Sequence, residues 1–376
     1  MSKKIVFSLM YISAIVNIIL TPISTSFARI FGYTTIILFA VLPFIIAPRM
    51  KVQLSYIVLF LSLVFSMLLS AEHFKVSLII DYLIPIISFF SFYYLLQMNF
   101  QLDVSFDFIY YPALILSFVF IAYSFFGFSF AYTAYNSYGS KVFTMGLGNP
   151  NAVSLYVLFE ILIFLIRISY EKSLVKRILL IILVGLMVVI LIRLDSRTMV
   201  VCAILTALFF FVKNPKRNIA IRVVACMLPF LIVFILAINK DSLFMQKIIM
   251  GKALDTGRAD IFLSFFDEIK AAPLQVVFGK FFKYPFKHLH NGPLTIVASL
   301  GIAGLIALIS IWKETLKKIS IAEKTKQQTL AYNFIFLFIV QASTEAITIL
   351  GTIPYSIFVL IIVFIANEKI KIKERY

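Results

Sequence analysis

Charged side chains are scarce in this sequence. Only 14% of the 376 residues are Asp, Glu, Lys or Arg, whereas 62% are hydrophobic and the mean hydropathy is +1.03. Soluble domains carry about 25% charged residues to cover their surface, so the composition excludes an ordinary water-soluble fold. We therefore expect lipid to be the solvent for most of the chain.

Cysteine and histidine are also rare, with two and three residues. Cys202 and Cys226 fall in consecutive apolar runs, near opposite ends of them, and a rise of ~1.5 Å per residue puts them at depths too different for a disulfide. His288 and His290 are two positions apart, a spacing that splays side chains on a helix, and no third ligand adjoins them. We expect no disulfide, no metal site and no cofactor.

Acidic residues number 17 against 34 basic ones, a net charge of +17. A nucleic-acid-binding protein could have such a balance, but here the basic residues form short clusters between apolar runs, and no nucleic-acid-binding motif accompanies them. We interpret the charge as a signal of membrane topology and expect no nucleic-acid partner.

Long apolar runs account for most of the chain. Only helices satisfy their own backbone in lipid without a closed barrel, and most of the runs are ~17–23 residues long, so each run is predicted to be a transmembrane helix. The fold class is thus an all-α polytopic membrane protein, residues 1–376 forming one integral membrane domain. About twelve spans are expected, at residues 5–27, 30–47, 54–70, 76–98, 107–127, 151–168, 175–194, 198–212, 219–238, 293–312, 330–350 and 353–366.

The first run could instead be a secretory signal, since it follows Lys3 and Lys4 and Ser26-Phe27-Ala28 resembles a cleavage site. Its apolar length exceeds the ~7–15 residues of a signal core. We expect an uncleaved first span.

Basic residues are distributed unevenly between the two sides. With the N-terminus inside, the inner segments hold 21 Lys and Arg, the short outer segments five, and one long outer loop eight. The positive-inside rule therefore places both termini in the cytoplasm and the chain in a bacterial-type inner membrane. One inner turn disagrees, because the segment from Gln97 to Asp107 carries Asp103 and Asp107 but no basic residue.

Two outer segments stand apart from the short hairpins and contain most of the polar information: Phe128 to Pro150, and the long loop of residues 239–292 between spans nine and ten. The long loop is not a simple linker. Part of it is predicted to be a helix lying at the outer interface, capped by Thr256, because apolar residues recur at helical spacing. These residues are Ile261, Phe262, Phe265, Phe266 and Ile269.

Two arginines in outer segments are candidates for binding an anion. Arg197 lies in a tight turn between two apolar helices, where a guanidinium is costly without a partner; the alternative is a snorkelling side chain paired with Asp195. Arg258 follows Gly257 at the predicted start of the loop helix. There, the guanidinium of Arg258 and the free backbone N–H groups of the helix N-terminus could face the same anion. Alternatively, it pairs with Asp255 or Asp260.

His290 is a candidate general base. An imidazole fixed at the membrane surface can take a proton from a hydroxyl, although a single interfacial histidine is more often inert. Asn291 is a plausible helix cap before Pro293, which favours the first turn of the next span.

Other polar residues are weaker candidates. Gly148-Asn149-Pro150-Asn151 is typical of a turn that opens a helix. Asp81, Glu160 and Glu345 are ionisable groups in or near lipid, where they are either functional or internal partners of arginines.

The order of these motifs resembles the O-antigen polymerase and O-antigen ligase superfamily over residues ~145–365. The matching features are Asn149-Pro150-Asn151, Ser196-Arg197-Thr198, a long outer loop with Thr256-Gly257-Arg258, and His288-Leu289-His290-Asn291 before Gly301-x-x-Gly304. The resemblance implies a GT-C-like, metal-independent, inverting glycosyltransferase that acts at the periplasmic face on glycans linked to undecaprenyl diphosphate.

The resemblance also implies roles for single residues. Arg197 and Arg258 would hold the donor diphosphate, and His290 would orient or deprotonate the acceptor hydroxyl. Asn149, Asn151, His288, Asn291 and Glu345 are candidates for supporting contacts.

Three functions stay open at this point. A polymerase adds the growing glycan to a new lipid-linked repeat unit, whereas a ligase moves the finished glycan to lipid A–core. We favour the polymerase, because the compact, Ile-, Phe- and Lys-rich chain resembles many polymerases. A flippase or carrier for lipid-linked glycans is the third alternative; its polar groups should lie at the bilayer midplane. The expected partners are the lipid-linked oligosaccharide, the bilayer and, as a candidate, a protein that regulates chain length.

Overall fold

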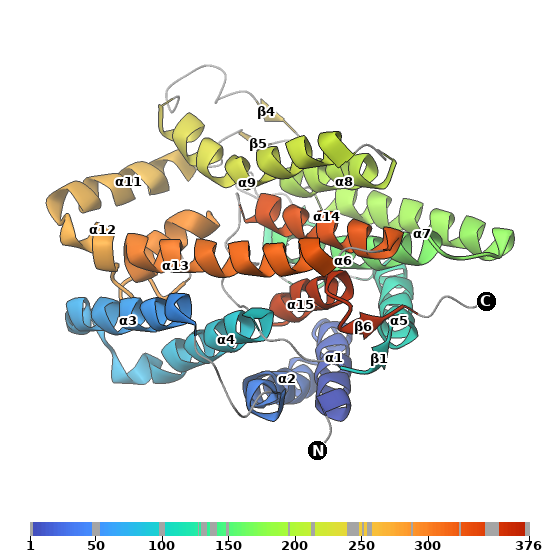
Figure 1. Ribbon diagram of the computed structural model, residues 1–376, viewed down its shortest axis with the longest axis horizontal. Helices are drawn as coiled ribbons and strands as arrows, with labels where there is room; N and C mark the ends of the chain where they lie inside the picture. Colours follow the sequence, from blue (N-terminus) through green and yellow to red (C-terminus); the bar gives the residue numbers. More distant parts are fainter. Residues whose placement is uncertain are drawn as a thin grey trace.

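The computed structural model is a bundle of helices with three short strand pairs (Figure 1). The structure describes residues 3–46, 53–97, 102–126, 128, 134–135, 141–147, 150–194, 196–211, 215–238, 248–249, 252–253, 258–286, 289–322, 325–342 and 353–372.

A helix occupies each of the twelve ranges in which a span is predicted. The helices are α1 (Lys3–Leu20), α2 (Thr25–Ile46), α3 (Leu54–Leu69), α4 (Ile79–Gln97), α5 (Phe106–Phe125), α6 (Pro150–Ile168), α7 (Leu174–Arg193), α8 (Arg197–Phe211), α9 (Pro215–Ile238), α13 (Gly292–Ala322), α14 (Lys326–Gln341) and α15 (Tyr355–Ala366). Among the described residues, seven helices are long and apolar enough to cross a membrane, and four others are shorter apolar helices. The protein is therefore an all-α protein of the membrane class, and twelve crossings remain a prediction.

Short elements connect these helices. Two 3-10 turns, η1 (Ala71–His73) and η2 (Val76–Leu78), link α3 to α4, and α11 (Arg258–Ala271) and α12 (Leu274–Phe278) precede α13. Strands β2 (Ala134–Tyr135) and β3 (Lys141–Val142) form one antiparallel pair, and β4 (Ile248–Ile249) and β5 (Lys252–Ala253) form another. A parallel pair joins β1 (Val104–Ser105) to β6 (Ile370–Lys371).

The first predicted span is wrong at its C-terminal boundary. Helix α1 ends at Leu20 rather than at residue 27, because Pro22 has no N–H for a helical hydrogen bond. The chain turns back at once into α2, and Asn17 Nδ2 donates to Ala28 O at 2.6 Å across the hairpin. Ser26-Phe27-Ala28 therefore lies in the first turn of a second helix.

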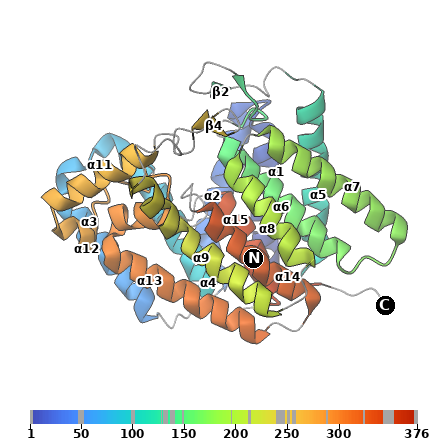
Figure 2. The ribbon, with the colours of Figure 1, turned by 90° about the horizontal axis from the view of Figure 1, so that it is seen from above.

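Helix α6 lies inside the bundle, whereas α7 lies at its edge. In α6, 89% of the span is buried, compared with 28% in α7. In Figure 2, α15 occupies the middle of the bundle and α7 its outer side. The exposed side of α7 consists of aliphatic residues such as Ile178, Ile181 and Ile182, so this surface is suited to lipid rather than to water.

The acidic turn between α4 and α5 has basic partners from distant parts of the chain. Asp107 accepts from Arg167 Nη1 at 2.6 Å, and Asp103 pairs with Lys371 Nζ at 3.2 Å. Strands β1 and β6 lie side by side next to these pairs (Figure 1). Lys318 Nζ donates to Gln97 O at 3.0 Å. Four segments predicted to be inner, around residues 97–107, 167–177, 318 and 369–371, thus meet at one end of the bundle.

Lys369, just after α15, is buried at this end with 1% of its surface exposed. Burial, together with the nearby charge of Lys318, lowers its pKa to about 7. A lysine in an unfolded chain has a pKa of ~10.4. Between about pH 7 and that value, Lys369 is therefore protonated in the unfolded chain but mostly neutral in the folded protein. The free energy of unfolding then increases as the pH rises through this window.

We therefore expect Lys369→Met to raise the thermal unfolding midpoint by several degrees at about pH 6, where the buried ammonium opposes folding. The gain should shrink toward about pH 10. The measurement is thermal unfolding of the purified protein in detergent at both pH values. An equal gain at both would contradict this account of Lys369.

Candidate functional site

Helix α11, in the long loop before α13, confirms the helix predicted there. Phe262 and Phe265 are buried in a small hydrophobic cluster with Leu289, Leu294 and other residues, and α11 packs against α9 and α12. Ile261, Phe266 and Ile269 border the same cluster. The predicted cap, Thr256, lies outside the described residues.

Arg258 and His290 flank this cluster from two segments. Arg258 is the first residue of α11 and precedes Ala259, which is fully buried in the cluster; His290 follows Leu289, which is 4% exposed in it. The guanidinium side chain is partly buried and the imidazole is exposed. The cluster therefore brings the N-terminus of α11 to the segment that leads into α13, and joins two predicted site residues that are 32 positions apart in sequence.

His290 has an unusual backbone conformation, with φ 39°. Left-handed residues other than glycine are uncommon, and histidine is among the types enriched there. The bend allows Leu289 to point into the cluster while His290 remains exposed. The fixed neighbours on both sides limit where the imidazole can lie.

Asn291 is confirmed as the cap of α13. Its Oδ1 accepts from Leu294 N at 3.0 Å, and its Nδ2 donates to Pro229 O of α9 at 2.9 Å. The residue is fully buried. These contacts give Asn291 a structural role, which is to hold the segment beside His290 in place.

The remaining predicted site residues belong to other parts of the chain or lie outside the described residues. Arg197 begins α8, but its side chain lies outside the described part of the structure. Asn151 is partly buried in the first turn of α6, where its carbonyl accepts from Ser154 Oγ at 2.7 Å. Asn149, His288 and Glu345 lie outside the described residues.

A break in α13 lies behind this region, and the sequence did not predict it. Gly301 has φ 73° and ψ 179°, which are not helical values, and Gly279 after α12 also has φ 73°. Their backbones cross so closely that a Cβ on Gly301 would lie 2.1 Å from Val277 O, and one on Gly279 would lie 2.5 Å from Leu300 N. Lys280 N donates to Ala298 O at 2.7 Å beside the crossing.

A serine of α3 and the serine that caps its C-terminus satisfy the irregular backbone that follows α12. Phe281 N donates to Ser66 Oγ at 2.6 Å, and Phe282 N donates to Ser70 Oγ at 3.0 Å. The Ser66 hydroxyl donates to Ser299 O of the broken helix. Non-helical backbone is tolerated at membrane depth only where protein covers it, and the Ser66-x-x-x-Ser70 spacing is the sequence signal that could have indicated this contact.

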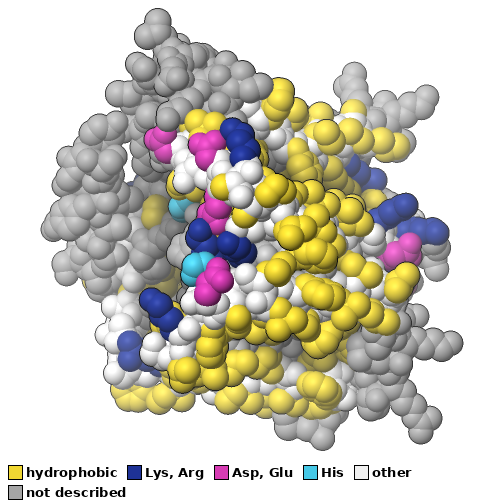
Figure 3. All heavy atoms as spheres, turned by 90° about the vertical axis from the view of Figure 1, so that its left-hand side faces the viewer, with side chains coloured by type: hydrophobic (Ala, Val, Ile, Leu, Met, Phe, Trp, Pro, Cys, Tyr) yellow, Lys and Arg dark blue, Asp and Glu magenta, His cyan; other side chains and the backbone are white. Residues whose placement is uncertain are grey.

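Charged residues gather on the face formed by α11 and the turn after α12. Figure 3 shows Lys or Arg and Asp or Glu side chains in one band beside a broad hydrophobic area. Lys283 Nζ lies 2.7 Å from Glu268 Oε1, and the Tyr284 hydroxyl donates to Glu268 Oε2. Partial burial alone would raise the pKa of Glu268, but the hydrogen bonds from Lys283 and Tyr284 outweigh it and lower that pKa.

The site so described has a guanidinium at a helix N-terminus and an imidazole beside the same hydrophobic cluster. Such groups can bind an anion and accept a proton. Among the described residues, no group of three His, Cys, Asp or Glu could hold a metal ion. No protein-family model, no curated protein and no solved structure matches this chain.

Proposed function

We propose that the protein is an O-antigen repeat-unit polymerase, an enzyme that transfers a growing glycan from undecaprenyl diphosphate to a hydroxyl of another lipid-linked repeat unit. The proposal places the reaction at the periplasmic face of a bacterial inner membrane, with both termini cytoplasmic. It rests on the order of sequence motifs, which resembles that superfamily, and on the all-α membrane fold.

One structural observation supports it most strongly. Arg258 and His290 come from different segments of the loop before α13 and flank one hydrophobic cluster. A transferase of this kind needs a cation for the diphosphate and a base for the acceptor, both outside the lipid. The two residues are of the required types and lie on the same small cluster.

The proposed reaction needs no metal or nucleotide. The acceptor hydroxyl attacks the anomeric carbon and His290 takes its proton, while the bond from that carbon to the diphosphate oxygen breaks. Arg258, with Arg197 as a second candidate, neutralises the charge on the departing undecaprenyl diphosphate. Attack from the face opposite the leaving group inverts the anomeric carbon.

A gel profile of surface lipopolysaccharide tests the proposal directly. A strain without this gene should show core bearing a single repeat unit, and the wild-type copy should restore the ladder of long chains. Core with no repeat unit at all would instead favour a ligase, which moves the finished glycan to lipid A–core, or a flippase if lipid-linked units also stayed on the cytoplasmic side.

Glu160 favours the alternative of a flippase or carrier. It is the eleventh residue of the 19-residue helix α6 and fully buried, and neither carboxylate oxygen has a hydrogen-bond partner in the described part of the chain. The Ser117 hydroxyl donates to Ala113 O instead, at 2.7 Å. A carboxyl at mid-helix is the kind of group that carriers use.

The variant Glu160→Gln separates the two functions. An ionised carboxylate without partners is costly to bury, so the fold accommodates the neutral acid, and glutamine has nearly the same shape. For a polymerase we expect the ladder of glycan chains to be unchanged within about twofold, measured by gel densitometry at equal protein level. Loss of the ladder, with lipid-linked units held on the cytoplasmic side, would favour the carrier.

A further inference from the structure

A groove of about 460 Å³ lies between α5 and α7, on the side of the bundle away from α11. One wall is formed by α5, with Leu114, Phe118 and Ile121, and the other by α7, with Leu179, Ile182 and Leu186. Arg167, Glu171 and Lys176 line one end, at the turn between α6 and α7. The groove is thus charged at one end and apolar along the rest.

The length of the groove matches one leaflet of a membrane. From Lys176 to Leu186 is ten residues of helix and from Tyr110 to Ile121 is eleven, each about 15 Å at ~1.5 Å per residue. Half of a ~30 Å hydrocarbon core has the same depth. The acyl chain of a lipid from one leaflet, with the lipid headgroup at the charged end, would fill this space.

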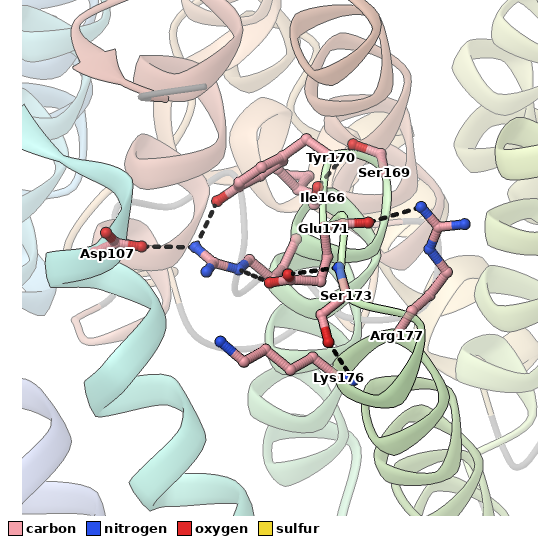
Figure 4. A network of polar contacts seen from close by, with 9 residues as sticks. Asp107, Ile166, Ser169, Tyr170, Glu171, Ser173, Lys176 and Arg177 are labelled. Atoms are coloured by element: carbon pink, nitrogen blue, oxygen red, sulfur yellow. Dashed lines mark hydrogen bonds and ion pairs between the residues drawn. The ribbon is translucent and has the colours of Figure 1, made fainter. Parts of the chain in front are cut away.

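Arg167 makes three hydrogen bonds at the charged end, to side chains of Asp107, Tyr170 and Glu171 that are labelled in Figure 4. Its Nη1 donates to Asp107 at 2.6 Å and to the Tyr170 hydroxyl at 3.0 Å, and its Nε donates to Glu171 at 3.2 Å. These bonds occupy two of the three guanidinium nitrogens, and no contact among the described residues occupies Nη2. A guanidinium held in this way, with the N–H groups of Nη2 still available as donors, is suited to bind a phosphate oxygen.

Lys176 supplies the second cation. It lines the groove in the first turn of α7, and its ammonium group makes no hydrogen bond or ion pair with the described residues. Asp107 and Glu171 together carry two negative charges against the single positive charge of Arg167, so the groove can attract a phosphate only with the added charge of Lys176. Basic pockets between helices near a membrane surface are typical binding sites for lipid headgroups.

We infer that this groove binds a phospholipid of the leaflet next to the α6–α7 turn, with one acyl chain between α5 and α7 and its phosphate on Arg167 Nη2 and Lys176 Nζ. The inference is independent of the proposed transferase activity. It needs only that these helices are embedded in a membrane.

The test is thermal unfolding of the full-length, delipidated protein in detergent with added phosphatidylglycerol, and with diacylglycerol of the same chains as the phosphate-free probe. We expect phosphatidylglycerol to raise the unfolding midpoint at lower concentrations than diacylglycerol. The variant Lys176→Ala should need about fivefold more phosphatidylglycerol for the same shift. Lys172→Ala removes the same charge from the same turn but not from the groove, and should behave as wild type.

A second pair of variants tests the apolar part. Ile182 and Ile181 are 55% and 54% exposed, but only Ile182 lines the groove. Ile182→Trp should therefore weaken the effect of phosphatidylglycerol, and Ile181→Trp should not. Equal stabilisation by both lipids, or equal losses in Lys176→Ala and Lys172→Ala, would overturn the inference.

Discussion

Replacing Gly301 with alanine is expected to destabilise the folded protein by more than ~3 kcal/mol. The left-handed backbone at φ 73° disfavours any side chain, and the new Cβ would lie 2.1 Å from Val277 O, which is backbone and cannot rotate away. The segment after α12 would have to separate from α13. Thermal unfolding in detergent, followed by size-exclusion chromatography, should show a large drop in the midpoint or loss of the monodisperse peak.

Gly185→Ala is the matched control. Gly185 lies in α7 with nothing within 4 Å of an added Cβ, and alanine is favoured over glycine in a helix by ~1 kcal/mol. This variant should unfold at the same temperature or higher. If Gly301→Ala were as stable as Gly185→Ala, the glycine crossing would not be the contact that holds α12 against α13.

Arg258→Ala and His290→Ala are each expected to reduce the formation of long glycan chains by at least ~100-fold. The first would leave the diphosphate without its cation, and the second would leave the acceptor hydroxyl without its base. Protein level and membrane insertion should remain normal, because His290 is exposed and Arg258 only borders the cluster. A lipopolysaccharide gel of the complemented deletion strain measures both effects.

Two controls match these variants in residue type. Lys270→Ala removes a cation near the other end of α11, where Lys270 forms an exposed pair with Asp267 at 3.0 Å. His73→Ala removes the histidine of η1, between α3 and α4. Both should keep a normal ladder. A normal ladder from Arg258→Ala or His290→Ala would refute the role given to that residue.

Most helices of the fold could be predicted from the sequence, because a long apolar run satisfies its backbone in lipid only as a helix. The helix within the long loop was also predictable, since Phe262 and Phe265 repeat at helical spacing. The break at Gly301 was not, because Leu300 and Ile302 continue the apolar pattern on both sides. Only the crossing with Gly279 shows why glycine is needed there.

Contacts between residues far apart in the chain could not be predicted either, because a local sequence pattern does not show which distant segments pack together. The acidic turn of Asp103 and Asp107 disagreed with the positive-inside pattern, and its basic partners lie 268 and 60 residues away. For the candidate site, the types and order of Arg258 and His290 were visible, but the cluster that connects them was not. The capping role of Asn291 followed from local spacing and was predicted.

The pairing of Asp103 with Lys371 has a consequence for the order of biosynthesis. At ~5–20 residues per second, the ribosome needs roughly ten seconds to a minute to add the 268 residues that separate the two side chains. Asp107 receives Arg167 much earlier, after 60 residues. Helices α5 and α6 can therefore pack together as a hairpin during translation. Strand β1 can pair with β6 only after α15, the last helix, has been synthesised.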